Sequence, residues 1–352
     1  MKKEFKILSV LLVFILTSMM CGCNEEQIYI DNSSIPSTIF TDTETSSEAT
    51  TSEETVTESE PEVSSEPIES SVPTVSVTPS STPKPSSVPI TPSVPQEPLP
   101  TPPVIEIAPE FVVNDPENTR GLSEKSMGYG HGEQVSKDNQ TRFNNMSGVD
   151  ALSIDTVTNR KCVYLTFDCG YEYNNLTASI LDTLKAKNVK AVFFCTLSYI
   201  KQNPRLVWRM INEGHIVGNH SDTHPVFPTI TRTKMAKEVY SVHKYMQENF
   251  GYTPKYFRFP TGAYSHSSLE LVTSIGYKSI FWSFAYKDWE TANQPAHSYA
   301  LEKIKGAFYP GSVLLLHAVS ATNTALLPQI IDYGISQGYT FSTLDEYYAI
   351  KN

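Results

Sequence analysis

The chain has 352 residues and a formal net charge of −11, and this length is enough for one large domain with additional segments. The charge is unevenly distributed: residues 1–119 hold 4 Lys and Arg against 19 Asp and Glu, whereas residues 120–352 hold 23 against 19. The weak positive charge of residues 120–352 is far below the basic density of a typical nucleic-acid-binding protein, so we expect no nucleic-acid partner. It suits contact with an anionic polymer such as cell wall.

Residues 1–23 have the pattern of a bacterial export signal. Three lysines precede an apolar stretch, residues 7–20, which is too short and too near the terminus for an ordinary membrane span. The residues directly before Cys23 resemble the lipobox of bacterial lipoproteins, which indicates lipid attachment at Cys23. We therefore expect export to the outer face of the cell membrane or the cell wall, with a lipid anchor in the membrane. Simple secretion and an uncleaved anchor are the alternatives.

Residues 24–110 are of low sequence complexity. Ser, Thr, Pro and Glu dominate, and apolar side chains are too sparse to bury a core. Pro-rich segments are stiff and extended, so this composition predicts a disordered stalk that holds a domain away from the membrane. Residues 111–160 contain much Gly, Asn and Ser with little periodicity, which predicts an irregular lead-in to a domain over residues 161–352.

From residue 161 onward, the hydrophobic pattern alternates between strands and helices. Seven strand-then-helix units in succession favour parallel pairing with right-handed crossovers. We therefore expect an α/β fold, a distorted (β/α) barrel of seven strands. The expected strands are residues 162–167, 191–195, 215–217, 256–259, 277–283, 312–316 and 339–342.

Three of the expected strands lead directly into titratable or metal-binding side chains. Asp168 follows the first strand, His220 and His224 follow the third, and His317 follows the sixth. The carboxyl ends of strands are where α/β enzymes build their sites. Neutral imidazole is the commonest ligand of a catalytic transition metal, so the two histidines four positions apart are candidate ligands of an incomplete site. Each match alone is weak, and their coincidence indicates a functional site.

Five segments at the ends of the expected strands resemble, in order and spacing, the five motifs of the polysaccharide deacetylases. This family is carbohydrate esterase family 4, and its members contain the NodB-homology domain. The resemblance covers residues 161–350 and is closest to the δ-lactam-biosynthetic, or N-acetylmuramic acid deacetylase, branch. The segments are T-F-D-C-G at 166–170, H-S-D-T-H at 220–224, R-F-P-T-G at 258–262, the segment from Trp282 through D-W at 288–289, and L-L-L-H at 314–317.

The resemblance implies roles in amide hydrolysis for residues at the first three segments. His220 and His224 match the metal-binding histidines of the family. Asp168 matches the general base that takes a proton from water, and Arg258 matches the residue that keeps this aspartate ionised. The backbone N–H of Thr261 matches a donor to the oxyanion.

The last two segments supply the acid and the substrate surface that the resemblance implies. His317 matches the general acid that protonates the departing amine, and Asp288 matches the carboxylate that holds this histidine and raises its proton affinity. Trp289 and Leu315 match residues that line the sugar cleft.

Cys169 departs from the family pattern, which usually has a metal-binding aspartate at this position. A thiolate could itself ligate zinc, because contact with the metal deprotonates the thiol. The alternative is a packing role without metal contact. Two imidazoles with an open third ligand suit a divalent metal, zinc first, with cobalt, manganese and nickel also suitable.

The resemblance implies a metal-dependent hydrolase that removes the N-acetyl group of muramic acid in the glycan strand of peptidoglycan. The branch acts on muramic acid without its peptide and leads to muramic δ-lactam, as in the spore cortex formed during sporulation. One alternative is deacetylation of N-acetylglucosamine in peptidoglycan or another amino-sugar polymer. A second alternative is a catalytically inactive glycan-binding lipoprotein, because Cys169 replaces an expected metal ligand.

Overall fold

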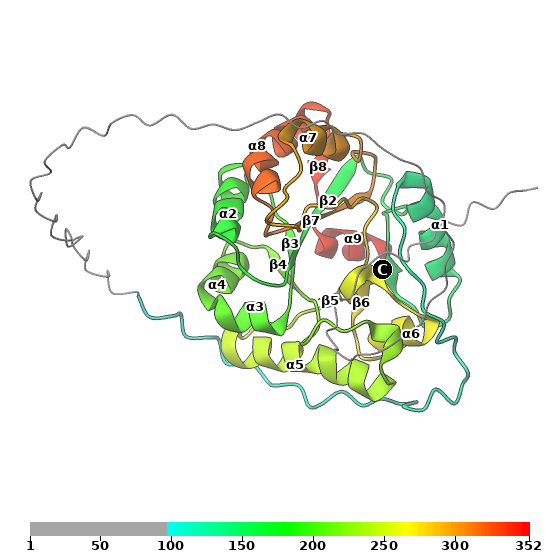
Figure 1. Ribbon diagram of the computed structural model, residues 1–352. Coiled ribbons are helices and arrows are strands. Elements are labelled where there is room, and N and C mark those ends of the chain that lie inside the picture. The colour runs from blue at the N-terminus through cyan, green and yellow to red at the C-terminus, as the bar shows by residue number, and fades with distance from the viewer. Residues whose placement is uncertain (1–96) are drawn as a thin grey trace, which may run out of the picture. The chain divides into compact units, whose positions relative to one another are not determined.

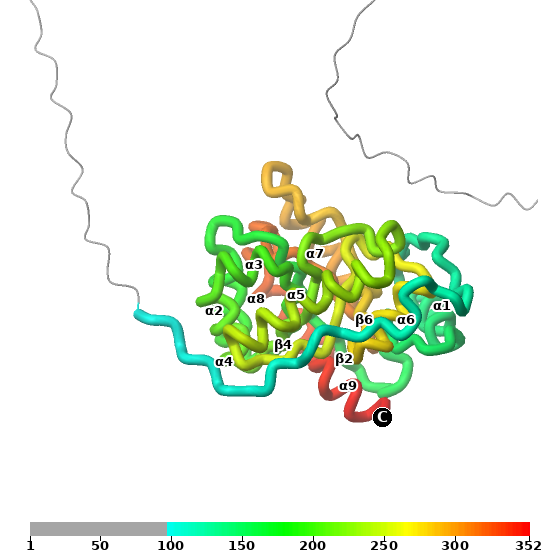
Figure 2. The backbone as a smooth tube through the Cα atoms, turned by 90° about the horizontal axis from the view of Figure 1, so that it is seen from below, coloured from blue at the N-terminus to red at the C-terminus, as the bar shows by residue number. Residues whose placement is uncertain are grey.

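A computed structural model of the protein describes residues 97–352 (Figures 1 and 2). The expected signal segment, the expected lipid attachment site at Cys23 and most of the expected stalk lie outside the described residues. Within residues 97–352, none of the helices combines the length and the apolar character needed to cross a membrane.

Parallel strands form the centre of the domain. They are β1 (Ala151–Leu152), β2 (Cys162–Cys169), β3 (Val192–Cys195), β4 (Ile216–Asn219), β5 (Tyr256–Phe257), β6 (Lys278–Ile280), β7 (Ser312–His317) and β8 (Thr340–Phe341). The sheet order is β1-β6-β5-β4-β3-β2-β7, and β8 pairs with the beginning of β2. A parallel bridge between Phe284 and Leu314 joins the chain after β6 to β7 and curls the sheet back on itself. The α/β fold expected from the sequence is confirmed.

Helices follow the strands and cover the outside of the sheet (Figure 1). Capping residues mark the ends of several of these helices, as in α5. Thr231 accepts a hydrogen bond from the backbone of Lys234 at the start of α5, and Gly251 ends that helix with a positive φ of 59°. The helices are α1 (Glu133–Asn144), α2 (Leu176–Ala186), α3 (Leu197–Gln202), α4 (Pro204–Asn212), α5 (Arg232–Phe250), α6 (His266–Ser274), α7 (His297–Lys305), α8 (Ala321–Ser336) and α9 (Leu344–Lys351), with short 3-10 turns at Phe227–Thr229 and Pro260–Gly262.

Strand β2 explains why the sequence shows continuous apolar runs rather than alternation. All eight of its residues are buried, because both faces of the sheet are covered. Tyr164 packs with Val313 and Phe194 on one face, whereas Leu165 and Phe167 pack on the other face under the helices. A parallel sheet buried on both sides needs such runs.

The expectation of an irregular lead-in over residues 111–160 is wrong in part. This segment contains helix α1 and strand β1, so the sheet has eight strands in the described part of the chain rather than seven. Helix α1 is polar along most of its length, with Phe143 as its main core contact, and β1 is two residues long. Neither element has enough apolar residues to produce a periodic signal.

The segment before α1 packs along helix α5, as Figure 2 shows. The backbone N–H of Ala108 donates to the side chain of Gln247 over 2.8 Å, and the hydroxyl of Tyr240 donates to the carbonyl of Ala108 over 3.1 Å. Phe111 contacts the rings of Tyr240 and His243. The lead-in is therefore attached to the domain before its first helix begins.

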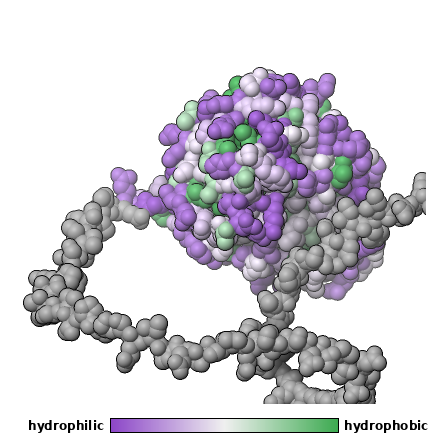
Figure 3. All heavy atoms as spheres, turned by 45° about the horizontal axis from the view of Figure 1, so that its top comes forward, coloured by the Kyte–Doolittle hydropathy of each residue, from purple (hydrophilic) through white to green (hydrophobic). Residues whose placement is uncertain are grey.

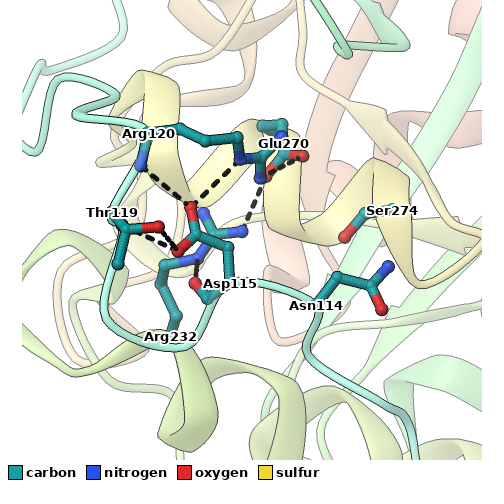
Figure 4. A pocket seen from close by; sticks show the side chains of 7 residues that line it. All are labelled: Asn114, Asp115, Thr119, Arg120, Arg232, Glu270 and Ser274. Carbon is teal, nitrogen blue, oxygen red and sulfur yellow. Dashed lines mark hydrogen bonds and ion pairs between the residues drawn. The ribbon is translucent and has the colours of Figure 1, made fainter.

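A network of four charged side chains fixes this lead-in to helices α5 and α6 (Figure 4). Arg232 is 3% exposed and donates to Glu270 over 2.7 Å, while Arg120 donates to both Glu270 and Asp115 over 2.8 and 3.0 Å. Arg232 also donates to the carbonyl of Asp115 over 2.7 Å. These groups line an open hollow of about 330 Å³. Because the charges compensate one another, we interpret the network as an anchor.

We expect Glu270→Gln to lower the free energy of unfolding by about 3 kcal/mol, because buried Arg232 would lose its charged partner. Burial alone would raise the pKa of Glu270, but the two arginines outweigh burial and hold this pKa below the ordinary value of 4.5. The stabilisation is therefore present at neutral pH and is lost as the pH falls below 4.5.

Urea unfolding at pH 7 and at pH 3.5 measures both effects. Glu302→Gln is the matched control, because Glu302 is exposed in its pair with Lys305 and should change stability by less than about 0.5 kcal/mol. An equal loss in both variants would contradict the anchor.

Candidate active site

The strand ends identified in the sequence meet at one edge of the sheet. Asp168 at the end of β2 lies in register with His317 at the end of β7. His220 directly follows β4 and lies 3.6 Å from Asp168, measured from Nε2 to Oδ2. The rings of His220 and His224 have centroids 4.9 Å apart. Parallel pairing brings these side chains together, because it places the carboxyl ends of the strands on the same side.

Arg258 holds the carboxylate of Asp168 inside the domain. Its Nη1 donates to Asp168 Oδ1 over 2.8 Å, and the guanidinium is fully buried. Burial alone would raise the pKa of Asp168, but the charge of Arg258, aided by His220, outweighs burial and lowers this pKa. Asp168 is therefore ionised, with Oδ1 bound to the arginine and Oδ2 directed toward His220.

The imidazole of His220 is fixed in one tautomer by the backbone. Its Nδ1 lies 2.9 Å from the carbonyl oxygen of Arg258, and a carbonyl can only accept, so Nδ1 carries the hydrogen. Burial lowers the pKa of His220 to about 4, although Asp168 opposes this change. Burial also lowers the pKa of His224. Both rings are neutral near pH 7, and the Nε2 lone pair of His220 faces Asp168.

The loop between the two histidines is held in a strained conformation. Ser221 and His224 have positive φ angles of 70° and 58°, which non-glycine residues rarely adopt. Ser221 Oγ accepts a hydrogen bond from the backbone of His224 over 3.0 Å. Thr223 donates from its backbone and its hydroxyl to Glu238 of α5, over 2.7 Å in each case. Glu238 could not be identified from the sequence, because a glutamate inside a helix gives no local signal of a loop contact.

His317 and Asp288 form a second pair on the other side of Asp168. Nδ1 of His317 lies 2.6 Å from Asp288 Oδ1, and the backbone N–H of His317 donates to Oδ2 over 2.9 Å. Asp288 is fully buried. Burial would lower the pKa of His317, but Asp288 outweighs burial and raises it. This imidazole can therefore hold a proton near neutral pH, with Nε2 left to face the site.

The remaining expected site residues differ in exposure. Trp289 is 47% exposed, and its ring centroid lies 5.2 Å from that of His317. Thr261 is exposed on the 3-10 turn after β5, with a positive φ of 58°. Leu315 is only 4% exposed and packs with Trp282 in the core, so it offers little surface to a substrate. Figure 3 shows a largely polar surface with small separate apolar patches on one face of the molecule.

Cys169 points away from the histidines. It alternates with Asp168 along β2 and packs under the helices with Cys195, its partner in register on β3. Burial raises the pKa of this thiol well above its ordinary value, with Cys195 adding to the effect. The packing alternative for Cys169 is therefore favoured over metal ligation.

Known proteins share this arrangement of sequence and fold. A family model described as polysaccharide deacetylase matches residues 155–280. The peptidoglycan-N-acetylmuramic acid deacetylase PdaA of Bacillus subtilis is 40% identical over 190 residues, which are 54% of this chain and 72% of that protein. The chain belongs to the polysaccharide deacetylase family. This confirms the resemblance drawn from the five segments and makes the protein a hydrolase of amide bonds.

A solved structure and one further relative show how far the similarity extends. The solved structure of B. subtilis PdaA, titled a family 4 carbohydrate esterase, aligns with a TM-score of 0.59 and 33% identity over 66% of this chain and 100% of that one. The peptidoglycan-N-acetylglucosamine deacetylase PgdA of Listeria monocytogenes is 34% identical over 58% of this chain and 42% of that protein. The similarity therefore extends to relatives that are named for two different sugars, N-acetylmuramic acid and N-acetylglucosamine.

The donor set at the cluster fits a cation. Deacetylases of this family are generally metal-dependent. Among residues 97–352, no three His, Cys, Asp or Glu side chains already form a closed metal-binding group. However, Nε2 of neutral His220 and Oδ2 of ionised Asp168 face each other at 3.6 Å, and both are acceptors. Two facing acceptors are best satisfied by a positive charge between or beside them.

We expect Arg258→Met to raise the pKa of Asp168 above its ordinary value of 3.8, because burial would act without the largest of the charges that oppose it. The variant should also lose about 4 kcal/mol of unfolding free energy, since one partner of a buried ion pair is removed. Carboxyl-carbon NMR titration of the full chain measures the pKa, and urea unfolding measures the stability.

Arg209→Met is the control for this pKa shift. Arg209 is partly exposed and pairs with Asp182 and Glu213, so its removal should leave the pKa of Asp168 unchanged. An unshifted pKa of Asp168 in Arg258→Met would show that the arginine does not keep this carboxylate ionised.

Proposed function

We propose that this protein is a metal-dependent deacetylase of peptidoglycan that removes the acetyl group from muramic acid residues whose peptide has already been cleaved off. The observation that carries the proposal is the placement of two oppositely tuned groups beside the histidine loop. Asp168 has a lowered pKa and His317 has a raised one. Amide hydrolysis needs such a base and such an acid at one site.

Asp168 would act as the base in this reaction. Its Oδ2 is not bound by Arg258 and faces the histidine loop, so it is placed to accept a proton from a water molecule there. Arg258 keeps the carboxylate ionised before the reaction and stays buried beside it. Protonation of Asp168 would be opposed by that charge, which favours return of the proton in a later step.

His317 would act as the acid. Asp288 binds Nδ1, so the other ring nitrogen is left to donate to the amine that departs from the sugar. Trp289 beside this ring offers an apolar face to the sugar, and the backbone N–H of Thr261 would stabilise the oxyanion. These roles follow the matching family motifs and are supported by the positions of the residues around Asp168.

His220 and His224 would hold the metal, with zinc as the first expectation and cobalt, manganese or nickel as alternatives. When bound, such a metal supplies a Lewis acid that polarises the acetamide carbonyl and lowers the pKa of water. The fixed tautomer of His220 supports this assignment, because Nε2 presents a lone pair. Cys169 would not contribute, since it faces the helices.

The muramic acid substrate is supported by identity to PdaA, which is 40%, against 34% for the Listeria PgdA. The product amine would close on the lactyl carboxyl to give muramic δ-lactam, as in spore cortex. Export and a lipid anchor at Cys23, with residues 24–110 as a stalk, would place the domain at this substrate outside the membrane. These assignments form part of the proposal.

Incubation with amidase-treated peptidoglycan tests the function. We expect the metal-loaded full chain to release acetate and produce muropeptides with muramic δ-lactam, measured by mass spectrometry. Asp168→Asn should lower the rate about 1,000-fold, because it removes the base without changing the size of the side chain.

Glucosamine oligomers distinguish the second candidate function. Acetate release from these oligomers, but not from peptide-free muramic acid, would assign the protein to N-acetylglucosamine. No acetate from either substrate, with glycan binding retained in both wild type and Asp168→Asn, would indicate an inactive binding protein.

We expect Glu238→Leu to weaken zinc binding about 10-fold, because groups that orient metal-bearing loops typically contribute this much. Thr223 would lose both of its bonds to helix α5, and the strained His220–His224 loop would lose its support. Competition with a chromophoric chelator measures the affinity.

Glu248→Leu on the same helix is the matched control for Glu238→Leu. Glu248 is exposed and forms an ion pair with Lys244 of the same helix, so the zinc affinity of Glu248→Leu should equal that of the wild type. Equal affinity in Glu238→Leu as well would contradict a role for Glu238 in holding the loop.

A further inference from the structure

The carboxylate of Asp288 is fully engaged on both oxygens. Oδ1 contacts Nδ1 of His317, and Oδ2 accepts from the backbone of His317 over 2.9 Å. A third donor, Nδ2 of Asn323, lies 2.5 Å from Oδ2. Asp288 and Asn323 are 0% and 1% exposed, so no water competes for these bonds. Three donors therefore converge on this one buried carboxylate.

Tyr286 fixes the orientation of the Asn323 amide. Its hydroxyl donates to Asn323 Oδ1, and burial raises the pKa of Tyr286, so the hydroxyl stays protonated. The amide oxygen must therefore face the tyrosine, and the amide nitrogen must face Asp288. This arrangement requires Asp288 to be an acceptor.

The first turn of α8 holds Asn323 in this position. Ser320 caps the helix and accepts from the backbone N–H of Asn323 over 3.1 Å. The same serine donates to Gln294 over 2.7 Å, and Gln294 donates to the carbonyl of Asp288 over 2.9 Å. The loop that carries Asp288 is thus joined to α8 at two separate points.

We propose that Asn323, oriented by Tyr286, is a positioning residue that keeps Asp288 in place as a hydrogen-bond acceptor and thereby keeps His317 ready to donate a proton. The inference rests on the proposed function, because it assigns His317 as the acid. Asn323 acts through Asp288 and does not contact the reacting atoms.

The pKa of His317 depends on Asp288 more than on the other charged neighbours of this ring. Asp168 of β2 also favours the protonated ring, whereas Arg258, which follows β5, opposes it, and His224 lies on the same side of the sheet. Since Arg258 and Asp168 are bound to each other, their opposite effects on the pKa of His317 largely cancel. A change in the position of Asp288 should therefore change the pKa of His317, because no other neighbour compensates for it.

The first test replaces Asn323 by Leu in the metal-loaded full chain. We expect kcat to fall about 10- to 100-fold with KM within twofold of wild type, because the acid is affected and the substrate surface is not. The basic limb of the kcat/KM profile should shift to lower pH by about one unit, since an acid that loses its proton more easily fails at lower pH. Tyr286→Phe should cause a smaller shift in the same direction.

Asn323→Asp is the second variant and keeps the shape of the side chain. When protonated, its carboxyl can accept from Tyr286 and donate to Asp288, as the amide does. Its pKa should be raised, because it is buried beside another carboxylate. Activity should therefore approach that of wild type at low pH and fall as the pH rises.

NMR of the histidine rings gives a readout that does not need activity. The Nδ1–H resonance of His317, assigned by comparison with His317→Gln, should move or broaden in Asn323→Leu. Thr324→Ala is the control on the same helix turn, because Thr324 bonds only to Ser320 within the described residues. Its NMR signal and pH profile should match wild type.

Two results would overturn the proposal. The first is a basic limb of the kcat/KM profile that is unchanged in Asn323→Leu. The second is an unchanged His317 Nδ1–H resonance in Asn323→Leu when this variant shows only a loss of thermal stability. If Asn323→Leu does not fold, the proposal would be overturned by a pH profile of activity in Asn323→Asp that runs parallel to that of the wild type at every pH. Wild type that lacks deacetylase activity, but whose His317 resonance responds to Asn323, would refute the proposed function and support the positioning role.

Discussion

The buried ion pair between Arg258 and Asp168 is the interaction on which the rest of the site depends. The guanidinium also donates to the carbonyls of Ile280 and Phe281 and packs over the ring of Phe194, 4.1 Å from its centroid. One side chain thus ties together β2, β3, β6 and the segment after β5. An arginine without water must satisfy its donors inside the protein, so the surrounding strands are fixed relative to one another.

The proposed base and the proposed acid have pKa values shifted in opposite directions, because each faces a different partner. Asp168 faces a cation and loses proton affinity, whereas His317 faces a carboxylate and gains it. His220 has a backbone carbonyl at Nδ1 and stays neutral. Burial makes each of these partners effective, because charges interact more strongly away from water. The same chemical groups on an open surface would titrate near their ordinary values.

The sequence predicted that the candidate side chains lie together, because parallel strands bring their carboxyl ends to the same side of the sheet. Once residues 162–167, 215–217 and 312–316 were identified as strands, the proximity of Asp168, His220 and His317 followed. Cys169 could be either a ligand or a packing residue from sequence alone. The pleat of β2 decided this, because adjacent residues on a strand point to opposite faces.

By itself, the sequence determined the order of the strands from β2 to β8, the family and the candidate groups for the chemistry, because these depend on local periodicity and on spaced motifs. Helix α1 and strand β1 escaped detection, since their stability comes from contacts with the sheet rather than from their own pattern. Only the tertiary structure assigned Glu238 to the histidine loop and Asn323 to Asp288. Their partners lie 15 and 35 residues away in sequence, and hydrogen bonds at such separations have no sequence period.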